Sequence, residues 1–383
     1  MMKLMRFRLW KHSGDLKMNR NILGEIEKIF DNLKAHVEDS DKERILNVKR
    51  HIKAIGDDTP VCDFVKMALK KDVYYASQFL VLFKFKDHSY LLVDEKFRDG
   101  LDEIGFEFEQ DDSPIAQGAG MLAMACNALP VRQELASLEL IERCLGVGPE
   151  TGEDICFNFN EIRQFFLPYC VALIDNSRFD ISFEEDLNRL ICYLLVKRCT
   201  RFNDSAKEEL KKLLLLVSSR SIAGCILNSL QSPLVEYTFL QLYQCLEYLF
   251  RLNNCFMLSA TYQIDLGKSI DIVLAHEFKI SESDNLGRVI RENAAEAAID
   301  RFVGIIPGYQ DANSDKYTKT SLYIYKLRCN IAHLRYQQDA MPNVNWEQCL
   351  TCLIEILYSI YEKRDRDISK VCEGKNSWTR ISF

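Results

Sequence analysis

The stretch that decides the fold is 232-SPLVEYTFLQLYQCLEYLFRL-252. It opens with Ser232 and Pro233, residue types that favour the N-cap and the first turn of a helix. Apolar residues then occur on most sides of five or six turns, a pattern typical of a helix at the centre of a bundle. We therefore expect a long central helix here, with its sequence neighbours packed around it.

The sequence downstream of this helix predicts more helices joined by polar loops. Helical patterns cover residues 265–278, 286–304 (LGRVIRENAAEAAIDRFVG), a segment around 326–335, and a segment that begins at Trp346. This arrangement predicts a helical bundle over residues 231–383.

The sequence upstream falls into two further regions. Residues 116–230 read as successive amphipathic helices, among them 160-NEIRQFFLPYCVALI-174, without a repeat of fixed period. Residues 1–115 begin with helical patterns and then alternate at 76–97, around a KDHS turn, and at 104–112. We therefore predict a mainly α protein with an N-terminal α+β module, whose small antiparallel sheet has two or three strands.

Composition limits the classes of function. The chain of 383 residues is 48% hydrophobic and 27% charged, and its formal net charge of -7 argues against general coating of nucleic acid. Its 14 cysteines are scattered from Cys62 to Cys372 without a short repeating spacing. Cys349 and Cys352 form a CxxC pair without a second pair, which favours core packing over zinc binding. We expect reduced cysteines, a cytoplasmic protein, no metal, no cofactor and no membrane segment.

One polar group stands out within the predicted bundle. In 326-KLRCNIAHLR-335, Arg328, Asn330 and His333 lie among apolar residues. The pairs Arg6–His12 and Arg44–His51 have similar spacings, but the first lies in a basic N-terminal tail and the second in a highly charged segment. The context therefore singles out Arg328 and His333.

This group resembles the signature of the HEPN superfamily, an arginine followed after four to six residues by a histidine on a late helix of a small bundle. The resemblance covers residues 230–363 and includes the early QCLEYLF helix and the helix that begins at Trp346. It departs from the family at Cys329, where HEPN nucleases often have a polar residue. This departure leaves the role of Asn330 open between orienting the site and an ordinary polar contact.

The residue types suit RNA cleavage without a metal. A histidine can take a proton from the ribose 2′-OH or deliver one to the leaving oxygen. A guanidinium stabilises the negative charge that gathers on the phosphate. Between Asp315 and Asp339 no acidic residue occurs, and the basic and aromatic residues there are candidate RNA contacts: Lys319, Tyr325, Lys326 and Arg335.

The family resemblance implies a regulated toxin or antiviral effector that is an endoribonuclease. It implies a homodimer, because one helix cannot direct residues five positions apart at a single phosphate. It also implies RNA, such as tRNA or mRNA, as a partner, together with a regulatory or antitoxin protein. The alternative is a helical module that dimerises or docks a partner without cleaving RNA. In that alternative, Arg328 and His333 bond to groups of the fold, and Glu247 is one candidate partner.

Overall fold

The structure is a computed structural model that describes a large part of the chain. The described residues are 22–37, 42, 52–53, 60–75, 78–132, 139–141, 155–156, 159–174, 184–275, 282–307, 315–332 and 344–373. Contacts divide the chain into two compact units, unit 1 at residues 1–175 and unit 2 at residues 176–383. The protein is mainly helical, and unit 1 contains the small antiparallel sheet that the sequence predicted.

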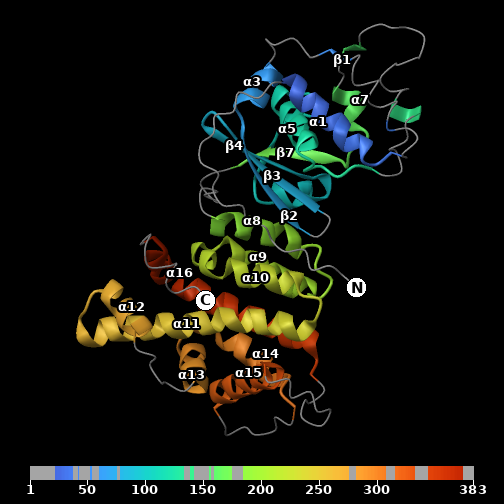
Figure 1. Ribbon diagram of the computed structural model, residues 1–383. Coiled ribbons are helices and arrows are strands. Elements are labelled where there is room, and N and C mark those ends of the chain that lie inside the picture. The colour runs from blue at the N-terminus through green and yellow to red at the C-terminus, as the bar shows by residue number, and fades with distance from the viewer. Residues whose placement is uncertain are drawn as a thin grey trace. The chain divides into compact units, whose positions relative to one another are not determined.

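Unit 1 combines helices with a five-stranded antiparallel sheet of order β2-β3-β4-β7-β5 (Figure 1). Its strands are β2 (Leu69–Tyr75), β3 (Gln78–Phe85), β4 (His88–Asp94), β5 (Glu107–Phe108) and β7 (Tyr169–Leu173). A separate parallel pair joins β1 (Ile52–Lys53) and β6 (Ile155–Cys156). The helical elements are α1 (Ile22–Lys34), α3 (Pro60–Met67), η2 (Glu95–Phe97), α4 (Arg98–Asp102), α5 (Pro114–Ala125) and α7 (Phe159–Arg163).

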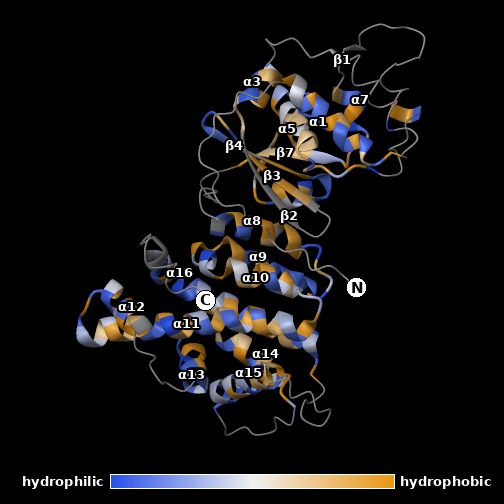
Figure 2. Ribbon diagram, in the orientation of Figure 1, coloured by the Kyte–Doolittle hydropathy of each residue, from blue (hydrophilic) through white to orange (hydrophobic). Residues whose placement is uncertain are grey.

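The core of unit 1 lies between the sheet and the helices α1, α3 and α5. Alternate residues of β3, namely Phe79, Val81, Phe83 and Phe85, belong to one buried cluster with these helices. Such alternation places every second side chain of a strand on the same face. Figure 2 shows that hydrophobic residues dominate β3.

Helix α5 packs closely because it contains small residues. A Cβ atom added to Gly120 would overlap the Tyr169 hydroxyl and lie 2.6 Å from Cζ of that ring, and one added to Gly118 would lie 2.8 Å from the Phe64 ring. The helix begins properly because Ser113 accepts a hydrogen bond from the N–H of Ala116 at 3.0 Å. Helix α5 can therefore approach β7 at Gly120, and α3 at Gly118, this closely only with glycine at these positions.

The prediction that residues 160–174 form one helix is wrong. Helix α7 ends at Arg163, and Tyr169–Leu173 form β7, which lies between β4 and β5 in the sheet. Pro168 has no N–H to continue a helix. Nearly all of β7 is buried, and the continuous apolar run that results resembles a buried helix in sequence.

Contacts do not follow the boundaries predicted at residues 115 and 230. Helix α5 packs on α1 and α3, and β7 completes the sheet, so both belong to unit 1. Helices upstream of residue 231 pack on helices downstream of it, so they belong to unit 2. The sequence break near residue 115 is the N-cap and first turn of α5.

Unit 2 is a helical unit in which two 28-residue helices, α11 (Val235–Tyr262) and α16 (Trp346–Glu373), run through the middle. Figure 1 shows α8, α9 and α10 on one side of α11 and α13, α14 and α15 on the other. The remaining elements are α8 (Glu184–Val196), α9 (Asp204–Leu215), η4 (Val217–Ile222), α10 (Ala223–Gln231), α12 (Leu266–Ala275), α13 (Glu282–Asn293), α14 (Glu296–Gly304) and α15 (Lys316–Ala332). Helix α16 packs on α9, η4, α11, α13 and α14.

Two predicted helix boundaries in unit 2 are corrected. Ser232 does not cap α11, which starts at Val235, and its hydroxyl instead bonds within the turn to Leu234. The segment 286–304 is not one helix, because α13 ends at Asn293 and α14 starts at Glu296. At this break the N–H of Ala295 donates to Ser359 of α16, so a tertiary contact replaces a bond of the helix.

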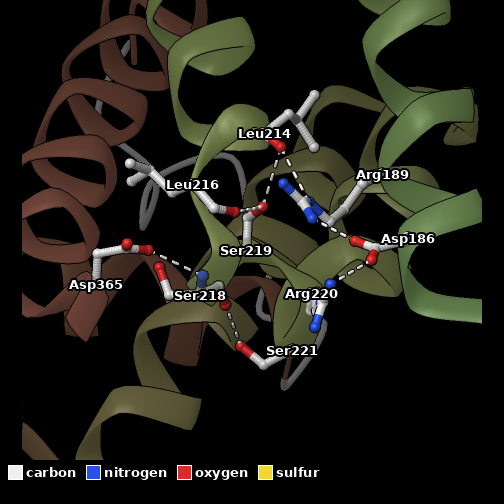
Figure 3. A network of polar contacts seen from close by, with 9 residues as sticks. All are labelled: Asp186, Arg189, Leu214, Leu216, Ser218, Ser219, Arg220, Ser221 and Asp365. Carbon is white, nitrogen blue, oxygen red and sulfur yellow. Dashed lines mark hydrogen bonds and ion pairs between the residues drawn. The ribbon is translucent and has the colours of Figure 1, made fainter. Parts of the chain in front are cut away.

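A buried ion network ties α8 to the chain between α9 and α10 (Figure 3). Asp186, which is fully buried, contacts the guanidiniums of both Arg189 and Arg220, the latter at 2.6 Å. Arg189 also donates from Nε to the carbonyl of Leu214 at 3.0 Å. Asp365 of α16 accepts from the N–H of Ser218 at 2.9 Å, so the same turn is fastened to the central helix.

Candidate functional site

The helix that bears the predicted motif is α15. Asp315 caps it by accepting from the backbone N–H groups of Tyr317 and Thr318 at 3.3 Å each. Its buried residues recur at helical spacing and face the core of unit 2: Thr320, Ser321, Ile324, Leu327 and Ile331. The described part of this segment ends at Ala332. His333 and Arg335 therefore lie outside the described residues, as do the other pairs Arg6–His12 and Arg44–His51.

Arg328 lies between two carboxylates from two other helices. Its Nη2 lies 3.4 Å from Oε1 of Glu247 on α11, and its Nε lies 3.4 Å from Oε1 of Glu282 on α13. The three side chains are 28%, 21% and 29% exposed, in the same order. The contact with Glu247 is the one that the sequence named as a structural role for Arg328.

Tyr243 completes this group, which we call the Arg328 cluster (Tyr243, Glu247, Glu282 and Arg328). Its ring centroid lies 6.0 Å from the guanidinium carbon, and its hydroxyl donates to Oε1 of Glu282 at 2.7 Å. Tyr243 and Glu247 are four residues apart on α11 and therefore share a face. Three helices thus fix the orientation of the guanidinium.

The cluster shifts the protonation of its members. Burial raises the pKa of Glu247, and the hydrogen bond and charge of neighbouring Glu282 raise it further, against the opposing effect of Arg328. Burial also raises the pKa of Tyr243, with the bond to Glu282 acting in the same direction. Burial works against the charge of Arg328, but Glu282 and Glu247 outweigh it and raise its pKa. The guanidinium is therefore the fixed positive charge of the cluster.

Two of the predicted RNA contacts, Lys319 and Lys326, lie on a different face of α15 from Arg328. At about 100° per residue, Lys319, Lys326 and Asn330 share one side of the helix, and Lys326 is about 160° from Arg328. Lys326 is exposed, and Lys319 and Asn330 are partly buried. Tyr325 is partly buried beside Cys329, whose hydrogen bond is the main cause of the raised pKa of Tyr325. One copy of the chain therefore does not bring Lys319, Lys326 and Asn330 together with Arg328. Tyr325, three residues before Arg328, lies on the adjoining face and is close enough for the charge of Arg328 to act on its pKa.

Sequence reasoning missed Tyr243 and Glu282. Tyr243 lies in an apolar helix where a tyrosine reads as core, and Glu282 stands at the start of a helix, where acidic residues are common. The sequence feature that could have revealed Tyr243 is its spacing of four residues from Glu247, which places both on one face of the helix. Only the crossing of α11, α13 and α15 reveals that these positions meet.

The described residues contain no group of three or more His, Cys, Asp or Glu that could hold a metal ion. Cys349 and Cys352 are buried in α16, as core packing predicted. The cysteines whose side chains the structure describes, Cys349 and Cys352 among them, are free thiols. No single described helix has both the length and the apolar character needed to cross a membrane, and α9 with the following η4–α10 segment has them only as a pair bent by 106°.

The chain matches no protein-family model, no curated protein and no solved structure.

Proposed function

We propose that unit 2 is a metal-independent endoribonuclease of HEPN type, in which Arg328 binds the scissile phosphate. The observation that supports this proposal is that Arg328 is partly exposed and is held by two carboxylates. Its guanidinium is 28% exposed and is held in one orientation by side chains from two other helices. A group that stabilises a transition state must be oriented before the reaction, and the Arg328 cluster provides that orientation.

His333 is the proposed acid and base. It follows Ala332 directly and lies five residues after Arg328. In the reaction, a base takes the proton of the ribose 2′-OH, whose oxygen attacks the adjacent phosphorus. An acid then gives a proton to the 5′-oxygen as its bond to phosphorus breaks. The products are a 2′,3′-cyclic phosphate and a 5′-hydroxyl.

Arg328 retains donors for a phosphate. A guanidinium has five N–H donors. The two described ion pairs engage one N–H each, from Nη2 and Nε. A phosphate oxygen can accept from the remaining N–H groups, while Glu247 and Glu282 hold the other edge of the guanidinium. Asn330, which points away from Arg328 on α15, would assist as a polar contact from the second copy of the helix in the dimer.

The proposed enzyme is a homodimer in the cytoplasm. Lys319, Tyr325, Lys326 and Arg335 would contact RNA, such as tRNA or mRNA. Since Lys326 and Arg328 point away from each other on one helix, a second copy of α15 would complete the site. The proposed role is a regulated toxin or antiviral effector, which a regulatory or antitoxin protein restrains. This role rests on analogy with the family.

A second candidate function is a helical module that dimerises or docks a partner without cleaving RNA. The specific observation in its favour is that Arg328 already has two anionic partners within the fold. Glu247 and Glu282 both contact its guanidinium, as they would in a purely structural ion network. In this case Arg328 holds α11, α13 and α15 together.

RNA cleavage by the purified full chain in EDTA separates the two candidates. Total RNA and tRNA are incubated with the wild type and with His333→Ala and Arg328→Ala. Matched controls are His88→Ala, an exposed histidine of unit 1, and Arg301→Ala, which removes an exposed ion pair with Glu355. The nuclease predicts that both site variants lose at least about 100-fold in rate, since each removes a group that acts in the transition state.

The products and the oligomeric state complete this test. Light scattering should give the mass of a dimer, and the RNA fragments should carry cyclic phosphates. Cleavage that persists in both site variants would show that other residues catalyse it. A dimer without cleavage on either RNA, with site variants of unchanged mass, would favour the helical module.

A further inference from the structure

A second arginine crosses the contact between α11 and α13. Nη2 of Arg288 on α13 donates to Oδ1 of Asn254 on α11 at 3.0 Å and to Oδ1 of Asn285 at 2.6 Å. Asn285 is buried and Asn254 is partly buried. The guanidinium is therefore held in place from both helices, as that of Arg328 is.

Arg288 differs from most arginines of the described chain in what holds it, although Arg201 likewise donates to neutral oxygens, a hydroxyl and a carbonyl. Carboxylates pair with many of them, namely Arg163, Arg189, Arg220, Arg291, Arg301 and Arg328. Within the described residues, Arg288 contacts only neutral amide oxygens, and its buried Nε has no hydrogen-bond partner. A partly buried cation without a nearby anion is costly in a fold. The positive charge of Arg288 is thus left for an anion from outside this part of the chain.

The two guanidiniums lie along one contact between the same two helices. Their partners on α11, Glu247 and Asn254, are seven residues apart. Seven residues are two turns, so the positions share a face within about 20° and are separated by about 10 Å along the axis. Their partners on α13, Glu282 and Asn285, are one turn apart. An extended anion that reaches Arg328 can therefore continue toward Arg288.

We propose that Arg288 binds a backbone phosphate of the same RNA strand whose scissile phosphate lies at Arg328. Asn254 and Asn285 are its positioning residues, and the unbonded Nη1 edge faces the phosphate. The ligand class is a single-stranded phosphodiester, because a lone guanidinium contacts the backbone without reading a base. This inference rests on the proposed function for its substrate and concerns binding alone.

Binding is measured apart from cleavage. The full chain is titrated into a fluorescent single-stranded RNA whose sugars are 2′-O-methylated, so that no 2′-OH can attack. Fluorescence anisotropy then gives the Kd at several salt concentrations. Arg288→Gln should weaken binding by about tenfold, as expected for one charge-assisted bond. It should also make the slope of log K against log salt shallower by about 0.7, the value for one phosphate contact on a single strand.

Three further variants isolate the charge. Arg288→Lys keeps the positive charge and should keep the salt slope. Asn254→Asp places a carboxylate beside Arg288, so it should weaken RNA binding as Arg288→Gln does and leave the Tm equal to or above that of the wild type. A purely structural arginine would gain a partner from Asn254→Asp and leave RNA affinity unchanged. Arg291→Gln is the matched control, because it removes a paired arginine from the same helix and should not change the Kd.

The outcomes separate this inference from the proposed function. If binding depends on Arg288 but unmodified RNA is not cleaved, the phosphate contact is supported and the proposed nuclease function is rejected. If RNA is cleaved but the wild type, Arg288→Gln and Asn254→Asp bind RNA equally well, only the proposed phosphate contact at Arg288 is rejected. A wild type that does not bind the RNA overturns the assignment of Arg288.

Discussion

At the residue scale, the Arg328 cluster places two carboxylates around one guanidinium. Each carboxylate is less than one third exposed, so solvent screens their repulsion only in part. Arg328 therefore has a structural consequence whatever its role with RNA. Its positive charge offsets the repulsion between the carboxylates of Glu247 and Glu282 at neutral pH.

We expect Arg328→Ala to reduce the free energy of unfolding at pH 7 by about 1–2 kcal/mol, because it leaves the two carboxylates without their cation. Adding Glu247→Gln should restore most of that loss, since one negative charge then disappears. Urea unfolding of the wild type, both single variants and the double variant measures this coupling.

The free energy of unfolding that Arg328→Ala removes should also depend on pH. Because folding raises the pKa of Glu247, the folded state holds that proton more tightly than the unfolded chain does. Stability therefore falls as pH rises from the ordinary glutamate pKa through the raised value. The effect of Arg328→Ala should accordingly be smaller at pH 5 than at pH 7. An equal loss at both pH values, with no restoration by Glu247→Gln, would mean that Arg328 acts by packing alone.

Part of this site could be predicted from the sequence. Arg328 and its partner Glu247 stand out as polar residues in apolar helices, and the reading that pairs them matches the described contact. Tyr243, Glu282 and Arg288 could not be found in this way. These residues meet only because three helices cross, and the helical period of a sequence does not predict the angles at which helices cross.

At the element scale, α5 lies close to its neighbours because two of its residues, Gly118 and Gly120, have no side chain. Gly120→Ala should destabilise unit 1 by about 2–4 kcal/mol, because the new methyl group overlaps Tyr169 and lies 2.8 Å from the Phe159 ring. The matched control is Gly24→Ala in α1, where no described atom lies within 4 Å of the new methyl group.

The control should behave in the opposite way. Alanine is a better helix former than glycine by about 0.5–1 kcal/mol, so Gly24→Ala should raise stability slightly. Thermal unfolding of both variants tests the pair. If Gly120→Ala were as stable as Gly24→Ala, the close approach of α5 to β7 would be wrong.

Elements with a clear local signal were predictable and elements without one were not. The hairpin of β3 and β4 follows from the KDHS turn between two short apolar runs, and this turn lies at Lys86, whose φ is 54°. Strand β7 is nearly continuous in apolar residues, so the sequence pattern could not separate it from a helix. The break between α13 and α14 has no proline, and it arises from the contact with Ser359.

At the scale of the whole molecule, the two units have separate cores. The sequence placed the last domain at residues 231–383, whereas contacts define a unit at 176–383. The difference arises because α9 covers α16 and α10 covers α11 with buried side chains such as Leu210, Leu213 and Leu227, and α8 packs on α9 and α10. Removal of these helices would expose a large apolar surface.

We therefore expect a fragment of residues 176–383 to fold alone and a fragment of residues 231–383 to fail. The first should show a helical circular dichroism spectrum and a single cooperative urea transition. The second should lack that transition or aggregate, since it exposes the covered faces of α11 and α16. Cooperative unfolding of the shorter fragment would support the boundary at residue 231 instead.

The place of α16 in the chain has a consequence for synthesis on the ribosome. This helix packs on α9, η4, α11, α13 and α14, yet its last residue, Glu373, follows the end of α10, Gln231, by 142 residues. At about 5–20 residues per second, translation needs roughly ten seconds or more to cover that distance. During this interval α9 and η4 lack α16, which packs on both of them. A ribosome that pauses before residue 346 would thus hold a nascent chain whose α9 and η4 expose the apolar faces that α16 later covers, and we expect chaperones to bind at this stage.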